Sequence, residues 1–157
     1  PYCSRKFNQL VMRIIGGETG VFCPFCRKRM EINLENFSII ADTSIMVGRI
    51  ITKDLATSSY FKGTRILIPE ELYISDLDRK RSDKRKGFSR EINELKEYRE
   101  CGIIDLKPIE SFGAETSYEK DVQLIRLAKR HSAILLTKDR NQAAVASASV
   151  RTIFVES

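Results

Sequence analysis

The sequence predicts an α/β protein built on a parallel sheet, with a small β unit ahead of it. From residue 37 onward, short apolar runs alternate with stretches of helical character. This alternation is typical of parallel strands that are connected by helices. Before residue 37, the chain instead shows a hairpin signal and closely spaced cysteines. We therefore expect two units, residues 1–36 and residues 37–157.

The alternation predicts the order of elements in the second unit. Strands are expected at residues 39–41, 65–68, 103–106, 133–136 and 152–155. Helices are expected at residues 44–59, from Pro69 onward, at 89–100, from Thr116 onward and at 141–149. Pro69 suits the first position of a helix, and Thr116 with Glu119 forms a capping box. The stretch 79–90 is expected to be a basic connection between two helices.

The first unit has the features of a zinc ribbon. Cys23 and Cys26 form a CxxC motif, and Cys3 lies ahead of a hairpin predicted from strands 10–15 and 29–34. A zinc ribbon holds its ion through four thiolates, and a cysteine before Pro1 would be the fourth. A redox CxxC or unrelated thiols are the alternatives. Because no long amphipathic helix follows Cys26, as a redox motif requires, we expect structural zinc.

Composition narrows the class of protein. The chain has 157 residues, of which 42% are hydrophobic and 31% charged, as in a soluble globular protein. No apolar run is long enough to span a membrane, and no signal peptide is recognisable. The four cysteines are too unevenly spaced for a disulfide-rich secreted protein, so we expect a cytoplasmic one. The net charge of +6 is compatible with a nucleic-acid partner.

Four aspartates are predicted to meet at one edge of the sheet. Asp42 and Asp139 each follow an apolar strand, Asp76 lies two turns into a helix, and Asp121 lies near the start of another. Ligands of open α/β sheets bind outside the carboxyl ends of the strands. Four carboxylates without a nearby lysine would repel one another, and Mg²⁺ or Mn²⁺ removes that conflict. Such a site suits hydrolysis of a phosphodiester.

Each aspartate also has a simpler explanation. Asp42 and Asp139 are suited to cap helices, Asp121 to complement a helix dipole, and Asp76 to lie in solvent on the surface. The coincidence of all four is what favours a metal site.

The second unit resembles the PIN domain, a nuclease family with a three-layer α/β/α fold. The resemblance lies in residues 40–44, 66–70, 119–121 and 135–140 and extends along residues 37–157. It is strongest for the archaeal branch that is attached to a hexameric ATPase and a KH domain. The resemblance implies that the metal-binding and catalytic acids are Asp42, Asp76, Asp121 and Asp139, supported by the hydroxyls of Ser44 and Thr137.

One residue departs from the pattern of the family. The second acid of PIN domains is usually glutamate, and Asp76 is one methylene shorter. Glu71 is a second possible ligand from the same helix.

A dense basic run follows Asp76. Such a run is commonly a solvated loop, but beside an acidic metal site it is also suited to bind a phosphate backbone. Its candidate nucleic-acid contacts are Arg79, Lys80, Arg81, Lys84, Arg85 and Lys86. We therefore expect a metal-dependent endoribonuclease that acts on RNA or single-stranded DNA. The alternatives are a non-catalytic RNA- or DNA-binding or assembly module and a toxin-type ribonuclease. By analogy with PIN relatives, we expect a homodimer or a higher oligomer.

Overall fold

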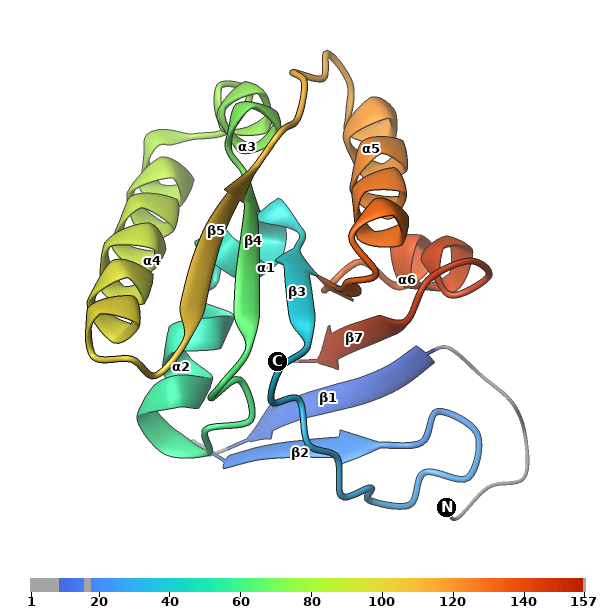
Figure 1. Ribbon diagram of the computed structural model, residues 1–157. Coiled ribbons are helices and arrows are strands. Elements are labelled where there is room, and N and C mark those ends of the chain that lie inside the picture. Colours follow the sequence, from blue (N-terminus) through green and yellow to red (C-terminus); the bar gives the residue numbers. More distant parts are fainter. Residues whose placement is uncertain (1–8, 16–17, 157) are drawn as a thin grey trace.

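The computed structural model describes residues 9–15 and 18–156, and over these residues the chain forms one sheet flanked by helices (Figure 1). The strands are β1 (Gln9–Ile15), β2 (Glu18–Phe22), β3 (Ser38–Ala41), β4 (Arg65–Pro69), β5 (Asp105–Ile109), β6 (Ile134–Thr137) and β7 (Thr152–Glu156). The helices are α1 (Thr43–Val47), α2 (Ile50–Thr57), α3 (Glu70–Leu77), α4 (Ser82–Glu100), α5 (Ser117–Arg130) and α6 (Arg140–Ala146). The predicted α/β class is confirmed.

The seven strands lie in the order β2-β1-β7-β6-β3-β4-β5, and all neighbours except β1 and β2 are parallel. Two buried apolar clusters cover the two faces of this sheet. Ile39 and Ala41 contribute to the cluster beneath α1, α2 and α4, whereas Ile40 between them packs with residues of α5 and α6. Side chains alternate along a strand, so a strand buried on both faces becomes a continuous apolar run. The arrangement is compatible with three α/β/α layers.

The β1–β2 hairpin extends the central sheet. Residues of β1 pair in parallel with β7, with Leu10 opposite Ile153 and Met12 opposite Val155. Met12 is buried in the same cluster as the helices on that face. We expected residues 1–36 and residues 37–157 to be separate units, but the hairpin of the first unit belongs to the same sheet as the strands of the second.

The strand expected at residues 29–34 is wrong, because that segment makes only an isolated bridge from Arg29 to Phe22. Its alternation has another cause. Leu34 is buried and Ile32 packs against the core, so an extended segment lays alternate side chains on the protein without a partner strand.

Two helix predictions also need correction. The helix expected at residues 44–59 is interrupted at Arg49, whose φ of 57° is left-handed, and it continues as α2. The basic connection expected at residues 79–90 is largely helical, since α4 begins at Ser82. Lysine and arginine are good helix formers, and an exposed helix accommodates them without cost. Gly87 does not break α4 but lets it approach α1, because a Cβ there would lie 2.7 Å from the Val47 carbonyl oxygen.

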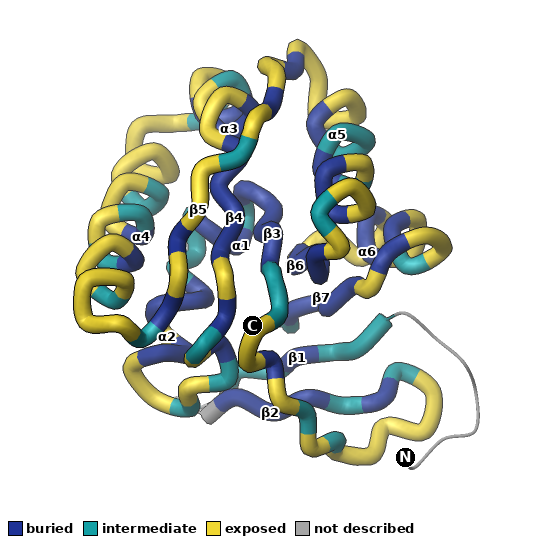
Figure 2. The backbone as a smooth tube through the Cα atoms, in the orientation of Figure 1, coloured by how far each residue is buried: buried dark blue, intermediate teal, exposed yellow. Residues whose placement is uncertain are grey.

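The central strands of the sheet are mostly buried, whereas β5 at its edge and the outer sides of the helices are largely exposed (Figure 2). No helix within the described ranges is both long enough and apolar enough to cross a membrane.

Candidate active site

Asp42 lies where β3 leaves the sheet, and it is 3% exposed. Its Oδ1 atom accepts a hydrogen bond of 2.7 Å from the backbone N–H of Thr43 and so caps α1. Its own backbone N–H donates to the Leu136 carbonyl at 2.8 Å, which ties it to the end of β6. The capping role is thus real, but it uses only part of the carboxylate.

Asp76 and Asp121 reach the same place from two helices. Asp76 lies on the last turn of α3 and is 2% exposed, whereas the Asp121 side chain on α5 is 30% exposed. The Nζ atom of Lys120 lies 2.9 Å from Asp42 Oδ1, 3.4 Å from Asp121 Oδ1 and 3.7 Å from Asp76 Oδ2. We call Asp42, Asp76, Asp121 and Lys120 the acid cluster.

The expectation that no lysine lies near these acids is therefore wrong. Lys120 was missed although its spacing gives a signal. It stands four, seven and eight residues before Leu124, Leu127 and Ala128, which form the buried stripe of α5. A lysine on the apolar face of a helix has to find a carboxylate inside the protein.

Charge and burial act against each other in the acid cluster. Burial alone would lower the pKa of Lys120, but the charge of Asp42, with those of Asp76 and Asp121, outweighs it and raises the pKa. The ammonium is consequently charged. Burial raises the pKa of Asp121, and the charges of Asp42 and Asp139 add to this against the opposing effect of Lys120.

Asp139 is connected to the acid cluster through Thr137. Asp139 is exposed and caps α6, with Oδ1 accepting from the backbone N–H of Asn141 at 2.8 Å and of Gln142 at 3.1 Å. The Thr137 hydroxyl accepts from the Asp139 backbone N–H at 3.0 Å. It lies 3.1 Å from both Asp42 Oδ2 and Gln142 Oε1, and it donates its proton to one of them at a time. The capping explanation thus accounts for Asp139 better than for the other three.

Tyr73 fixes α3 beside β3. Its buried hydroxyl donates a hydrogen bond of 2.5 Å to the Ala41 carbonyl, next to Asp42. Burial, together with the charge of Asp42, raises its pKa, so the hydroxyl stays protonated. The Tyr73 ring contacts Phe88 edge-on with centroids 5.2 Å apart. Sequence reasoning overlooked Tyr73, which lies one turn before Asp76 on the same helix.

Ser44, one of the two supporting hydroxyl residues, and Glu71, the second possible ligand, lie in different surroundings. Among the described residues, the buried Ser44 Oγ atom has no hydrogen-bond partner. Glu71 is exposed in the first turn of α3. Asp76, and not Glu71, is therefore the acid of α3 that joins the acid cluster.

The basic run divides into an inner and an outer part. Arg79 donates to Asp76 Oδ1 at 2.9 Å and also to the Ala114 carbonyl, and Lys80 lies 3.9 Å from Asp76 Oδ2. These two side chains neutralise Asp76 from the connection between α3 and α4. The outer part consists of Arg81, Lys84, Arg85 and Lys86, all of which are exposed. The four side chains of the outer part make no ion pair with the acid cluster among the described residues and are available to a phosphate backbone.

The acid cluster has the donor chemistry of a magnesium or manganese site. Hard cations prefer carboxylate oxygens, and Asp42, Asp76 and Asp121 supply them from three elements. Asp76 Oδ2 is buried and makes no hydrogen bond within the part of the chain that is described. Across residues 9–15 and 18–156, no three histidine, cysteine, aspartate or glutamate side chains are arranged to hold a metal ion as they stand. Between the three carboxylates lies the ammonium of Lys120.

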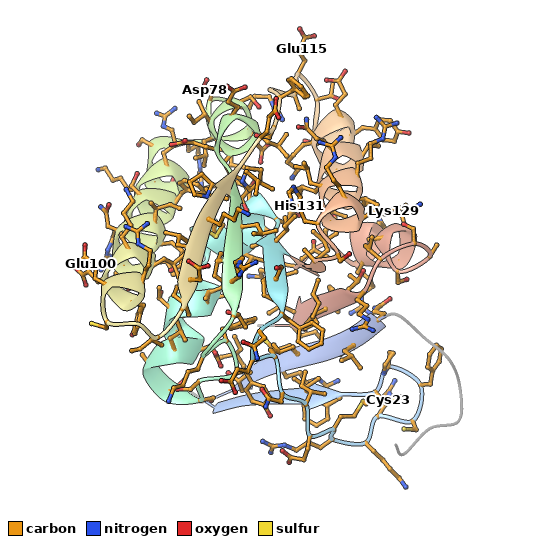
Figure 3. The ribbon with its side chains drawn as sticks, in the orientation of Figure 1. Cys23, Asp78, Glu100, Glu115, Lys129 and His131 are labelled. Atoms are coloured by element: carbon orange, nitrogen blue, oxygen red, sulfur yellow. The ribbon has the colours of Figure 1, made fainter. Side chains whose placement is uncertain are left out.

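Cys23 and Cys26 lie in a turn after β2, where Figure 3 labels Cys23. Cys23 is buried, and its Sγ atom accepts from the backbone N–H groups of Phe25 at 3.4 Å and Cys26 at 3.5 Å. Arg27 closes the turn with a φ of 62°. Backbone N–H groups directed at a cysteine sulfur are compatible with a knuckle that ligates zinc. Cys3 lies outside the described residues.

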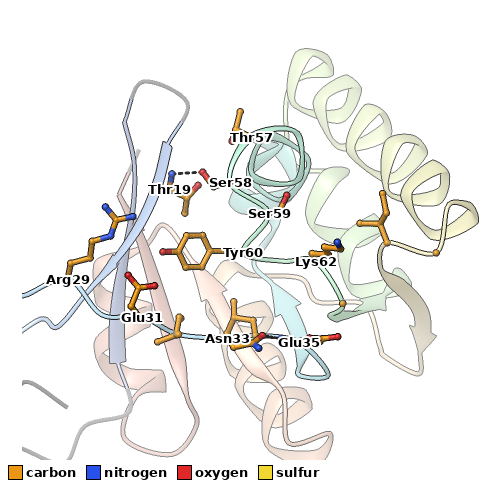
Figure 4. Close-up of a pocket in the computed structure, with 15 residues that line it drawn as sticks. Thr19, Arg29, Glu31, Asn33, Glu35, Thr57, Ser58, Ser59, Tyr60 and Lys62 are labelled. Carbon is orange, nitrogen blue, oxygen red and sulfur yellow. Dashed lines mark hydrogen bonds between the residues drawn. The ribbon is translucent and has the colours of Figure 1, made fainter.

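A cleft of about 1000 Å³ lies at the opposite edge of the sheet (Figure 4). Residues that precede β3, β4 and β5 line it, among them Glu35, Tyr60 and Ile103. At its wall, the Thr19 backbone N–H donates to Ser58 Oγ at 2.8 Å and joins the hairpin to the end of α2. The cleft contains no member of the acid cluster, and it lies at the amino ends of the strands.

Comparison with known proteins supports the fold alone. No family model matches the chain, and no curated protein resembles it significantly. The structure is similar to that of a domain of a functionally unknown protein from Methanocaldococcus jannaschii DSM 2661, with a TM-score of 0.66. The two share 23% sequence identity over 77% of this chain and 92% of that one.

Proposed function

We propose that the protein is a metal-dependent endoribonuclease with a PIN-like domain. The convergence of Asp42, Asp76 and Asp121 on one cation, from three different elements, is the observation that carries the proposal. A helix cap or a solvated acid does not require buried carboxylates to share a partner. The motifs that resemble PIN domains include Asp42 and Asp121, whereas Asp76 lies outside them and departs from the usual glutamate.

In this proposal, Asp42, Asp76 and Asp121 hold Mg²⁺ or Mn²⁺. Ser44 lies close to Asp42 in sequence, and its hydroxyl oxygen has no hydrogen-bond partner among the residues described. When bound, the metal ion activates water and stabilises charge on the scissile phosphate. Thr137 orients Asp42 through Oδ2 and connects it to Asp139. Tyr73 holds α3 against β3, which keeps Asp76 beside Asp42.

The outer basic residues suit a phosphate backbone. Arg81, Lys84, Arg85 and Lys86 are exposed at or just before the first turns of α4, which follows the acid-bearing helix α3. Contacts of this kind neutralise phosphates without reading the base sequence. We infer a single-stranded nucleic acid as substrate, RNA in the first place.

Structural zinc at the cysteine knuckle is the second part of the proposal. We expect one zinc ion per chain by elemental analysis and its loss in Cys23→Ser and Cys26→Ser, because each change removes a thiolate from the knuckle. Cys101→Ser is the control, since Cys101 is exposed and follows α4. A full-length protein purified without zinc contradicts this part of the proposal.

A non-catalytic nucleic-acid-binding module is the alternative that one observation favours. Lys120 neutralises part of the acid cluster, so the fold can hold these acids together without a metal ion.

A cleavage assay on single-stranded RNA distinguishes the two functions. We expect cleavage by wild type with Mn²⁺ or Mg²⁺, none with EDTA, and a loss on the order of 100-fold in Asp42→Asn. Asparagine still caps a helix, so the variant keeps its fold. Asp78→Asn is the matched control, because Asp78 is exposed at the end of α3. Equal rates in wild type and Asp42→Asn favour the non-catalytic module.

A further inference from the structure

We propose that Lys120 is a tethered cation that holds the place of the divalent ion and so sets the metal affinity of the site. The inference rests on the proposed function, because it concerns the same acids. A divalent ion binds between Asp42, Asp76 and Asp121 only when the ammonium of Lys120 moves away from them.

The position of the ammonium is the first argument. Its Nζ atom is within 3.7 Å of oxygens from all three carboxylates, and the side chain is only 10% exposed. Lys80 also lies near the acid cluster, but it approaches Asp76 alone, at 3.9 Å, and is 28% exposed. Lys120 is therefore central to the three acids and Lys80 peripheral.

The second argument is that the ammonium alone neither neutralises the three carboxylates nor hydrogen-bonds all of their oxygens. Asp76 Oδ2 faces the ammonium from 3.7 Å, and among the residues described it makes no hydrogen bond, although the side chain is 2% exposed. One positive charge in the centre faces three carboxylates, and the two other nearby cations, Arg79 and Lys80, reach Asp76 alone. A divalent ion carries the second charge that the ammonium lacks.

Mutual exclusion is the third argument. Two cations within a few ångströms of the same carboxylates repel each other strongly where water is scarce. The ammonium has somewhere to go, because lysine has a flexible four-carbon stem and the adjacent Asp121 is partly exposed. Lys120 therefore competes with the metal ion without blocking the site permanently.

Calorimetric titration of the full-length protein with Mn²⁺ tests the inference. We expect Lys120→Met to bind Mn²⁺ at least about tenfold more tightly than wild type, since removing the competing charge leaves the carboxylates unneutralised. Lys120→Gln is expected to shift in the same direction and serves if the methionine variant does not fold. Lys120→Arg keeps the charge and is expected to gain nothing. Lys129→Met, at an exposed position of the same helix, is the matched control.

The outcomes separate this inference from the proposed function. Unchanged or weaker Mn²⁺ binding in both neutral variants, or no binding in any protein, overturns the role of Lys120. Absence of Mn²⁺-dependent cleavage by wild type overturns the endoribonuclease, whatever the variants bind. Tighter binding in Lys120→Met without cleavage by wild type leaves the tethered cation in place and removes only the proposed activity.

Discussion

The acid cluster and the contact between α2 and α4 both bury carboxylates, and they do so in different ways. In the acid cluster, Asp42, Asp76 and Asp121 surround an ammonium. Between α2 and α4, the buried Glu91 receives neutral donors, among them the Thr52 hydroxyl at 2.5 Å and the Thr52 backbone N–H at 3.4 Å. The charge of Arg49 also acts on Glu91, but the Arg49 side chain is hydrogen-bonded to Glu94.

The lack of a paired cation affects the ionisation of Glu91. Burial raises the pKa of Glu91 to about 7, although the Thr52 hydrogen bonds and the charge of Arg49 oppose it. A carboxyl group that can become neutral near physiological pH needs no counter-ion. In the acid cluster, by contrast, the ammonium of Lys120 lies within 3.7 Å of all three carboxylates and supplies a counter-ion.

The largest effect is expected in the acid cluster, when its central ammonium is removed. Lys120→Met should lower the free energy of unfolding by about 3–5 kcal/mol in EDTA, because it leaves buried carboxylates without their cation. Urea unfolding monitored by circular dichroism measures this, and added Mn²⁺ should restore most of the loss. Lys129→Met should change little. A Lys120→Met protein as stable as wild type in EDTA contradicts the counter-ion role.

A smaller effect is expected from Glu91→Gln, and it depends on pH. The folded pKa of Glu91 lies above its ordinary value of 4.5, so its stabilisation is complete below about pH 4.5 and is lost as the pH rises through about 7. From pH 4.5 to pH 8, the variant should therefore gain up to about 3 kcal/mol relative to wild type.

Urea unfolding at several pH values measures the gain, and Glu97→Gln is the control at an exposed position of the same helix. Parallel pH profiles for wild type and Glu91→Gln show that Glu91 does not titrate abnormally.

The smallest effect is expected at Tyr73, which lies between the two regions. Its hydroxyl reaches the carbonyl before Asp42, and its ring contacts Phe88, one turn before Glu91. Tyr73→Phe should cost about 1–2 kcal/mol by removing one buried hydrogen bond. It should leave the pH dependence from Glu91 intact, and Tyr118→Phe is the exposed control. A loss of that pH dependence would show that the two regions are coupled.

The sheet was largely predictable because buried parallel strands read as apolar runs. The expected strands 39–41, 133–136 and 152–155 each fall within one residue of β3, β6 and β7 at both ends. Predictions from short sequence patterns were wrong where pairing with another strand determines the structure. Residues 29–34 alternate like a strand but find no ladder, and the expected strand 103–106 shifts to β5 because β4 sets its register.

The meeting of Asp42 and Asp121 was predictable because one follows a strand and the other lies in the first turns of a helix, whereas Asp76 stands on the last turn of α3. The counter-ion of these acids was not predictable, because a lysine is assumed to face water. The helical stripe with Leu124, Leu127 and Ala128 places Lys120 inside, but the pattern alone does not say which carboxylates it meets. That depends on where α3 and β3 lie, which the sequence of α5 does not contain.

The pairing of β1 with β7 has a consequence for the order in which parts of the chain reach their native contacts. Arg13 and Glu156 on these strands are ion-paired across 143 residues of chain, at 2.8 Å. During synthesis, the hairpin emerges first, but its place in the sheet exists only after the last strand has been made. Contacts between such distant residues slow folding, because a long loop must close before they form. The hairpin is therefore the first part of the described chain to be translated and among the last to reach its native neighbours.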